Sequence, residues 1–408
     1  MNRMAKSDSI DGSGFPLGFK FRQGPARSPL VSGATGRDVF KVEARQLVGH
    51  QKEAVVTEGV SGSSWRLVCD EGKHLKATDL APFPLGYFNA GLQADLVNRI
   101  LWLARARSIR LDSLDVALKN FYYMTGAFFR GDGKGYAEPA KVKVIIGSAA
   151  PKDAIAKLVR DSVAASPALA AMRTAVQNTF AIYVNGKRRE VTTMKNSPAL
   201  NAADPLKTYS AAPSPLAGTS DLSELVRKTG QLREGTVTEA PAGTTTRIIR
   251  TVDGTCQLLD PAGITETDTV LGLPGMSHFA LKSDERGATG GASVPDKGPA
   301  GLSLLSAGIA FCYMTQLARY IEHMKFKIRQ VRLVQFNPYT LEGAATDGSA
   351  RGDIEPVDTH LFLHGEESDE THEKLMRIAA TTCYLHATLS SALEPEVAIE
   401  VNGATLAA

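Results

Sequence analysis

The sequence has few cysteines, almost no net charge and no long uninterrupted run of apolar residues. Cys69, Cys256, Cys312 and Cys383 are the only cysteines among 408 residues, and no CxxC pair occurs. Neither a disulfide scaffold nor a zinc site of the usual spacing is therefore expected. Forty-six basic residues are offset by forty-three acidic ones, which gives no electrostatic sign of nucleic-acid binding. In a reducing compartment, a cysteine that has a function is reactive rather than structural.

The chain also lacks the features of a membrane or secreted protein. No stretch approaches the roughly 20 consecutive apolar residues that span a bilayer. The first residues, MNRMAKSDSIDGSGFPLGFKF, contain no apolar core of a secretory signal. The sequence therefore predicts a cytoplasmic protein that makes no contact with a membrane.

Comparison of the chain with itself reveals two copies of one unit. With a shift of 217 residues, Pro84–Gly186 aligns with Gly301–Gly403 without a gap. Only about one position in six is identical, but the apolar positions stay in register, and the tripeptide VNG at Val184 falls on VNG at Val401. A period of this length indicates a duplicated domain rather than a solenoid.

Both copies predict the same order of elements. Alternating and helical apolar patterns give a long helix, two strands, a second helix and a closing strand. In the first copy these lie at 85–107, 111–121, 141–146, 151–173 and 180–186, and in the second at 302–324, 328–336, 359–364, 368–391 and 397–403. Upstream strands are expected at 39–47, 53–59 and 63–70, and at 245–252, 255–260 and 277–284.

The predicted fold class is α+β with four segments. Residues 1–33, which are rich in Gly, Ser and Pro, are expected to form a flexible tail, and residues 34–190 the first domain. The Pro-, Ala- and Ser-rich residues 191–228 are expected to be a linker, and residues 229–408 the second domain.

The repeat separates two cysteines from their counterparts. Cys312 falls on Asp95, and Cys383 falls on Ser166, so only the second copy carries both thiols. A carboxylate within an apolar helix is costly unless it is paired, and Arg99, one turn after Asp95, is the expected surface partner. Ser166 is expected to be a helix residue without chemistry.

Two segments of the second copy resemble the OsmC/Ohr family of thiol-dependent hydroperoxide reductases. GLSLLSAGIAFC, which ends at Cys312, is similar to the family's Pro-Glu-x-Leu-x-x-Ala-x-x-x-x-Cys helix. EKLMRIAATTC, which ends at Cys383, resembles the segment before the family's second cysteine, and the AIEVNG end also fits. Family members are intertwined homodimers with active sites at the interface. The resemblance thus implies two tandem OsmC-like domains, each with antiparallel strands and a long central helix, that form a pseudo-dimer within one chain.

The resemblance also implies a chemistry. Cys312 would be the peroxidatic cysteine, whose thiolate attacks the O–O bond of an organic hydroperoxide and becomes a sulfenic acid. Cys383 would be the resolving cysteine that condenses with it, and an external dithiol would reduce the resulting disulfide. No cofactor and no metal is implied.

The family holds its thiolate with an arginine from the early strands, supported by a glutamate after the helix's opening proline. ATGRD at 34–38 resembles the family's Gly-Arg-Asp segment and nominates Arg37, with Arg66 and Arg247 as the other candidates. The proline and glutamate positions hold Gly301 and Leu302 in the second copy, whereas the first copy has Pro84 followed by leucine.

Several other residues have alternative interpretations. His386 follows Cys383 by three residues and so shares its helical face, where it could activate a nucleophile. His360, His364 and His372 surround a strand–helix junction and are expected to be solvated rather than metal-bound. Cys69 and Cys256 are expected to be plain strand residues.

Three functions stay open from the residues alone. The first is reduction of organic hydroperoxides with Cys312 and Cys383. The second is hydrolysis of a thioester or activated ketone, with Cys312 as nucleophile. The third is a non-catalytic protein that binds a lipid or aromatic ligand between the long apolar helices.

Overall fold

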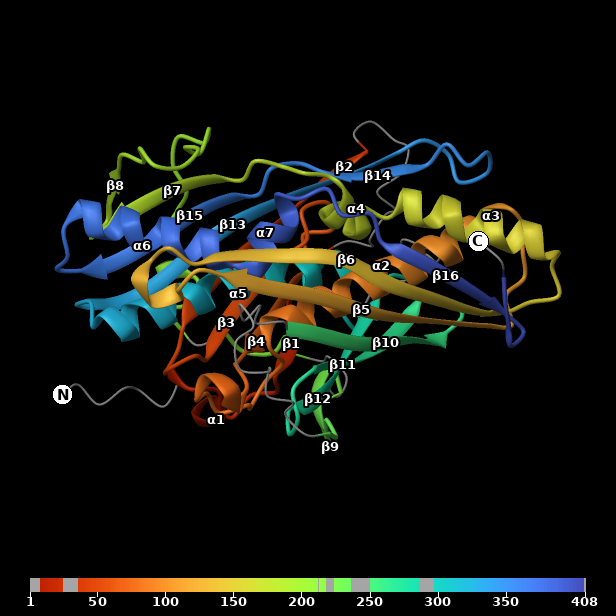
Figure 1. Cartoon of the computed structure of the whole chain (residues 1–408), viewed down its shortest axis with the longest axis horizontal. Coiled ribbons are helices and arrows are strands. Elements are labelled where there is room, and N and C mark those ends of the chain that lie inside the picture. Colours follow the sequence, from red (N-terminus) through yellow and green to blue (C-terminus); the bar gives the residue numbers. More distant parts are fainter. Residues whose placement is uncertain are drawn as a thin grey trace.

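Two β-sheets with two long helices between them form the described part of the chain (Figure 1). The computed structural model describes residues 8–24, 36–211, 213–217, 224–235, 250–286 and 297–406. Both α-helices and β-strands are present in each half, so the predicted α+β class is confirmed.

The first half contains four helices and eight strands within these residues. The helices are α1 (Ile10–Ser13), α2 (Pro84–Ala106), α3 (Lys152–Ala165) and α4 (Pro167–Arg173). The strands are β1 (Gly18–Arg22), β2 (Arg37–Gln46), β3 (Lys52–Thr57), β4 (Ser64–Cys69), β5 (Ser113–Thr125), β6 (Lys134–Gly147), β7 (Thr179–Val184) and β8 (Lys187–Arg189).

Within the described residues, the second half repeats this series from the counterpart of β1 onward. Its helices are α5 (Gly301–Met324), α6 (Asp369–Thr382) and α7 (Tyr384–Leu389). Its strands are β9 (Val226–Leu232), β10 (Arg250–Asp260), β11 (Ile264–Leu271), β12 (Ser277–Asp284), β13 (Ile328–Glu342), β14 (Arg351–Ile354), β15 (Asp358–Gly365), β16 (Glu396–Val401) and β17 (Ala404–Thr405).

The repeat seen in the sequence is a repeat of structure. From the long helices onward the elements keep the shift of 217 residues, so that α3 falls on α6 and β7 falls on β16. Even the unusual backbone positions recur: Ser108 and Lys325 both have positive φ, as do Asn185 and Asn402. The chain is therefore a tandem duplication at the level of single turns.

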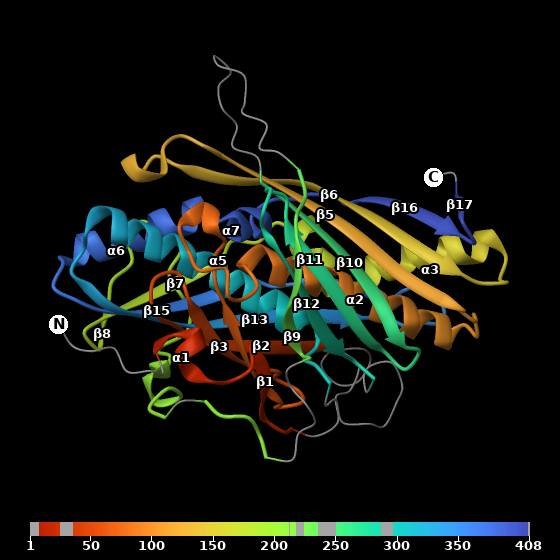
Figure 2. The same ribbon diagram turned by 90° about the horizontal axis from the view of Figure 1, so that it is seen from below.

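The two copies are interlocked and do not stand side by side. One sheet, called sheet A, has the order β1-β4-β3-β2-β13-β15-β7-β8, with β14 paired to β13. The other, called sheet B, has the order β9-β12-β11-β10-β5-β6-β16-β17. The β5–β6 hairpin of the first copy thus extends strands of the second (Figure 2), and β13–β15 extend strands of the first.

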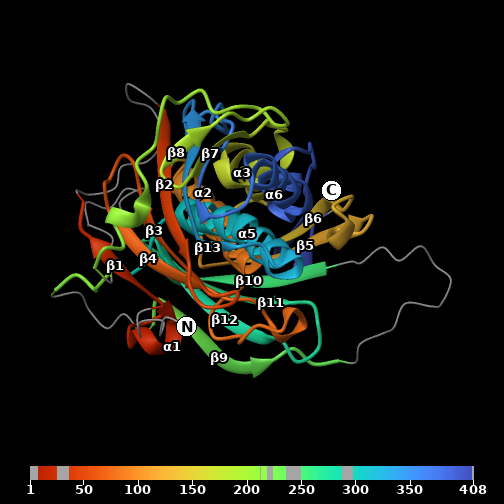
Figure 3. The ribbon, with the colours of Figure 1, turned by 90° about the vertical axis from the view of Figure 1, so that its left-hand side faces the viewer.

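The long helices occupy the space between the sheets. Figure 3 shows both helices between the sheets, seen from one end of the molecule. Helix α2 contacts β10 and β11 of sheet B, and α5 contacts β2 and β3 of sheet A. At their contact, each helix presents a glycine to the backbone of the other helix. A Cβ on Gly91 would lie 2.6 Å from the Leu305 backbone nitrogen, and one on Gly308 would lie 2.7 Å from the Phe88 nitrogen. Only glycine lets the two backbones come this close.

Helix α5 is long and apolar enough to cross a membrane, which differs from the expectation that no stretch approaches this composition. It is the single helix of this kind within the described residues, and its apolar window is wholly buried inside the protein. The length and composition of α5 are thus those of a helix in the centre of the core, since every face of it meets protein.

Parts of the segments expected to be a tail and a linker are instead strands of the repeat. Within 1–33, β1 pairs with β4, and Phe19 and Lys20 are buried there. Within 191–228, β9 begins at Val226 and pairs with β12 in the equivalent edge position of sheet B. Tyr209 of the same segment donates a hydrogen bond of 2.5 Å to the Glu43 carbonyl oxygen in β2. These short edge strands were not predicted, because the Gly- and Pro-rich composition around them is typical of tails and linkers.

Two other predicted elements differ from the structure. The second helix of each copy is broken, at Ser166 in the first and at Cys383 in the second, where ψ is 111° and 118°. Pro167 explains the first break, because a residue before proline avoids the helical region. The predicted strands at 245–252 and 255–260 merge into β10 over their described residues, and β11 was missed.

We predict that Gly308→Ala lowers the free energy of unfolding, measured by urea denaturation. Alanine in a helix is favoured over glycine by about 1 kcal/mol. Against this, overpacking at a closed contact costs about 1–3 kcal/mol, and the new methyl group would meet backbone atoms that cannot rotate away. An increase in the free energy of unfolding would show that α2 and α5 are free to separate at this point.

Candidate functional site

The two cysteines of the second copy lie together at the middle of α5. Cys312 is on α5, and Cys383 is the residue at which α6 ends and α7 begins. Both are buried and free. Burial raises the pKa of the Cys383 thiol well above its usual value, and a hydrogen bond with the Cys312 side chain raises it further. The structure thus places the two thiols within hydrogen-bonding reach of each other.

Cys312 lines a small cavity that we call the thiol cavity, of about 110 Å³. One part of its wall is apolar and is formed by Leu75, Phe83, Pro84, Leu85, Met124 and Leu271. The other part is polar and is formed by Glu71, His74, Arg250, Thr315, Gln316, Arg319 and Tyr384. Pro84, the proline that opens α2, therefore comes to Cys312 from the other copy.

Two guanidinium groups face the thiol cavity. Arg319 follows Cys312 by two turns of α5, and Arg250 begins β10. Burial lowers the pKa of Arg319, whereas the charges of Glu71, Tyr384 and Cys312 favour its protonated form. A thiolate at Cys312 would have the cationic neighbours that a reactive cysteine requires.

Glu71 is the carboxylate of this cavity and comes from the turn after β4. Its Oε1 accepts a hydrogen bond of 2.5 Å from the Thr315 hydroxyl, and the Lys52 ammonium lies 3.9 Å away. Burial raises the pKa of Glu71. The residue after the helix-opening Pro84 is Leu85, so a carboxylate reaches the cavity from a strand end instead of the helix.

A wider hollow of about 600 Å³, called the vestibule, shares His74, Leu75 and Arg319 with the thiol cavity. It also contains His50, which like His74 is half-buried and has cationic neighbours. Burial foremost lowers the pKa of each imidazole to about 4. Both imidazoles are therefore neutral at pH 7, and the permanent positive charge at this entrance comes from lysine and arginine.

His386 contacts Cys383 and not Cys312. Its Nδ1 lies 3.3 Å from the Cys383 Sγ, and its ring packs between Phe180 and Tyr313, with centroids 5.6 and 5.1 Å away. Burial lowers the pKa of His386 to about 4. Among the described residues its Nε2 has no hydrogen-bond partner. The expected Cys–His pair thus exists, although the break at Cys383 puts both residues at a helix start.

The first copy fills the same position with a charge network. The Ser166 hydroxyl donates a hydrogen bond of 2.6 Å to Asp95 Oδ2 and so is more than a plain helix residue. Arg99 Nε lies 3.4 Å from Asp95 Oδ1, and Arg99 also pairs with Glu285 at 3.0 Å. Arg99 is the expected partner, but it is 2% exposed and not at the surface. The group contains no thiol.

Two of the three arginines proposed from the sequence, Arg37 and Arg66, do not line the thiol cavity. Arg37 is 44% exposed and forms an ion pair with Glu355 at 2.6 Å. Arg66 is buried against Glu53 at 2.8 Å, and Arg247 lies outside the described residues. Arg250, three positions later, was missed because the upstream strands do not keep the shift of 217 residues. In the strand register, Tyr122 pairs with Arg250, and its repeat counterpart Tyr339 pairs with Asp38. A comparison of the two copies by strand register could therefore have found Arg250 as the counterpart of Asp38.

The other histidines are not exposed as a group. His360 is buried and lies 3.0 Å from Asp358 and 3.2 Å from the Tyr183 hydroxyl, and His372 is buried on α6. Only His364 is exposed, as expected. No group of three potential metal ligands occurs in the described ranges. Cys69 and Cys256 are buried in β4 and β10, in agreement with their expected place in strands.

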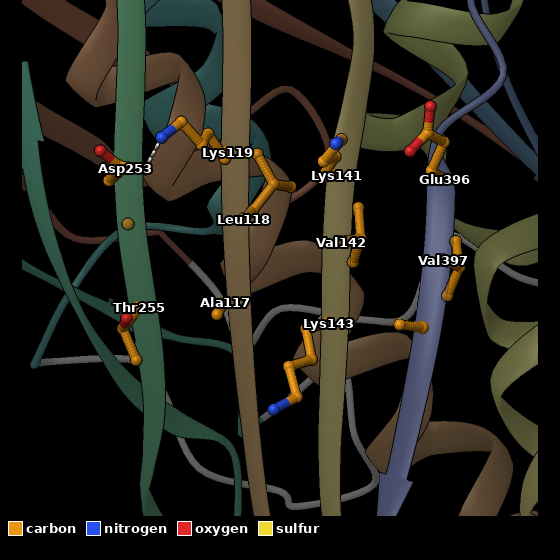
Figure 4. Close-up of a pocket in the computed structure, with 12 residues that line it drawn as sticks. Ala117, Leu118, Lys119, Lys141, Val142, Lys143, Asp253, Thr255, Glu396 and Val397 are labelled. Atoms are coloured by element: carbon orange, nitrogen blue, oxygen red, sulfur yellow. Dashed lines mark ion pairs between the residues drawn. The ribbon is translucent and has the colours of Figure 1, made fainter. Parts of the chain in front are cut away.

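A further hollow of about 470 Å³ crosses β10, β5, β6 and β16 of sheet B (Figure 4). Neither cysteine nor histidine lines it, and Lys119 on its rim pairs with Asp253 at 3.2 Å. Without a nucleophile or a buried acid–base group, this hollow is a weaker candidate than the thiol cavity.

Comparison with known proteins gives one family and one solved structure. A solved structure of an OsmC-like hydroperoxide resistance protein from Jannaschia sp. CCS1 aligns with 39% of this chain and 99% of its own, at 21% identity and a TM-score of 0.25. No curated protein matches the chain. Residues 294–398, which contain Cys312 and Cys383, match the family described as OsmC-like protein.

Proposed function

We propose that this protein reduces organic hydroperoxides with the Cys312–Cys383 dithiol. The observation that carries the proposal is the contact between the two buried thiols beside a cavity that holds two guanidinium groups. The family match and the hydroperoxide resistance described for the Jannaschia protein agree with a reaction of this class.

The reaction has two steps that need no cofactor. The Cys312 thiolate attacks one peroxide oxygen, the O–O bond breaks, and the second oxygen leaves as an alcohol after it takes up a proton. The Cys312 sulfenic acid then condenses with the Cys383 thiol, which forms a disulfide and releases water. An external dithiol, or two molecules of a thiol, then reduces the disulfide and restores both cysteines.

The walls of the thiol cavity suit an apolar peroxide. Phe83, Leu85, Met124 and Leu271 provide surface for the organic part of the substrate. Arg250 and Arg319 would stabilise the thiolate and the negative charge that develops on the leaving oxygen. Glu71 favours the protonated form of Arg319 and would therefore hold that charge in place.

The structure gives the hydrolase alternative less support. A cysteine hydrolase needs a base on its nucleophile, but His386 contacts Cys383, which does not line the thiol cavity. Cys312 has guanidinium groups beside it, which stabilise a thiolate but do not accept its proton.

We predict that one equivalent of cumene hydroperoxide converts the reduced protein to a Cys312–Cys383 disulfide, detected by intact mass and peptide mapping. Cys312→Ser abolishes peroxide consumption, since the attacking sulfur is gone. Cys383→Ser leaves a sulfenic acid on Cys312 that a dimedone probe labels, because no second thiol condenses with it.

Cys256→Ser is the matched control and leaves the reaction unchanged, because Cys256 lies in β10 outside the thiol cavity. Cys69 interacts electrostatically with Cys312, so a Cys69–Cys312 disulfide would show that the resolving residue was misassigned. Turnover of a thioester by the anaerobic reduced protein, with both thiols intact, would favour the hydrolase.

We also predict that Arg319→Gln slows alkylation of Cys312 by iodoacetamide at pH 7 by about tenfold or more, because an adjacent opposite charge favours an ionised group by at least that factor. Arg319→Lys restores part of the rate, since it keeps the charge. Arg329→Gln, on the exposed part of β13, is the control with the same change of charge. Equal alkylation rates for Arg319→Gln and the wild-type protein would show that Arg319 does not stabilise the Cys312 thiolate.

A further inference from the structure

A second cavity lies beside the dithiol, and no residue lines both it and the thiol cavity. It has a volume of about 540 Å³ and is called the reductant cavity here. It is bordered by the start of β6, the segments before β7 and after β8, and the ends of α6 and α7. Lys134, Lys195, Arg377 and His386 are among the residues that line it.

The α6–α7 junction forms the wall between the two cavities. Tyr384 lines the thiol cavity, and His386, two residues later, lines the reductant cavity. Cys383 precedes both and contacts Cys312 on one side and His386 on the other. The junction also packs against β6, because a Cβ on Gly135 would lie 3.0 Å from the Thr382 carbonyl oxygen. Cys312 therefore lines the thiol cavity, whereas Cys383 lines neither cavity and is joined to the lining of the reductant cavity by its contact with His386.

His386 connects the buried thiol with the reductant cavity. Nδ1 of this 4% exposed ring lies 3.3 Å from the Cys383 Sγ. Nε2, the other ring nitrogen, has no partner among the described residues, while the ring lines the cavity. A buried polar atom without a partner is rare, and here it is an acid–base group that a ligand in the cavity would satisfy.

The charged side chains that line the reductant cavity are positive. Lys134, Lys195 and Arg377 line it, and no carboxylate does so within the part of the chain that the structure describes. Glu373 lies one turn before Arg377, but its Oε1 already accepts hydrogen bonds from the Thr192 and Thr193 backbone amides at 2.5 and 2.7 Å. A cavity with this lining attracts an anion.

We propose that the reductant cavity receives a small anionic thiol, which reduces the Cys312–Cys383 disulfide by attacking Cys383. The proposal rests on the peroxidase function, because that function generates the disulfide. The volume is that of a small-molecule site, and the carboxylate of the thiol would contact Lys195 and Arg377.

The exchange balances in two steps. The incoming thiolate bonds to Cys383 Sγ, the Cys312–Cys383 bond breaks, and Cys312 leaves as a thiolate beside Arg250 and Arg319. A better-stabilised leaving thiolate departs faster, which favours attack on Cys383. A second thiolate then attacks the sulfur of the bound small thiol in the mixed disulfide. The two small thiols leave as their own disulfide, and the Cys383 thiolate recovers a proton through His386.

The test measures reduction of the full-length oxidised protein by three small thiols, with each rate divided by the thiolate concentration. Mercaptopropionate is anionic, mercaptoethanol is neutral and cysteamine is cationic. The protein is oxidised separately with hydroperoxide and with diamide, so that the disulfide does not depend on peroxide chemistry. The wild-type protein is expected to react fastest with mercaptopropionate.

The Lys195→Gln/Arg377→Gln variant is expected to lose about fivefold or more of the mercaptopropionate rate, because two cations are removed from the docking surface. Its rate with mercaptoethanol stays within about twofold, since a neutral thiol gains nothing from the cations. Lys152→Gln/Lys207→Gln removes the same charge at exposed positions outside this cavity and keeps the selectivity. His386→Asn slows all three thiols by a similar factor.

Equal rates for the three thiols, or an equal loss of the mercaptopropionate rate in the two double variants, would refute the proposal that the reductant cavity receives an anionic thiol. A disulfide that forms with diamide but not with hydroperoxide would instead refute the peroxidase function, while the selectivity measurement still tests the cavity. Failure of both oxidants to form the disulfide would refute both.

Discussion

The close contact of α2 and α5 is the constraint on which the remaining structure depends. Gly91 and Gly308 are equivalent in the repeat, and each presents its Cα to the backbone of the opposite helix. This contact fixes the distance between the helices and thereby the place of Cys312 opposite the start of α2. Pro84 and Leu85 reach the thiol cavity only because the helices lie at this distance. The site is thus assembled from both copies, although the thiols belong to one.

The two copies place different residues at the same two positions of the fold. In one, a Cys–Cys contact lies beside a cavity with cationic groups. In the other, Asp95 and Ser166 occupy the same two positions and join Arg99 and Glu285 in a buried network. Breaking such a network leaves an unpaired buried charge, which is costly. The first copy therefore keeps the architecture of a site but uses its centre for packing.

The sequence was sufficient for the repeat and the α+β class, because these depend on patterns that survive a fixed shift, whereas the pairing of Cys312 with Cys383 was implied only by the family resemblance. The exchange of strands between copies could not be read from composition or periodicity, since β5 has the same alternation whichever sheet it joins. The resemblance suggested Arg37, which lies in an exposed ion pair, whereas Arg250 and Glu71 reach the cavity through strand ends whose loops differ between copies. Residues placed by hairpin register are thus the hardest to find in advance.

The interlocked sheets also constrain how the chain reaches this structure. The Asn337 side chain donates a hydrogen bond to the Phe40 carbonyl oxygen 297 residues away, and β2 has β13 as its neighbour along that edge. During synthesis β2, β3 and β4 emerge long before β13, so the edge of β2 stays unpaired while the second copy is made. Contacts this distant slow folding and leave strand edges exposed to other chains. Joining two copies in one polypeptide therefore keeps the missing edge at a high local concentration but delays its arrival until β13 has been synthesised.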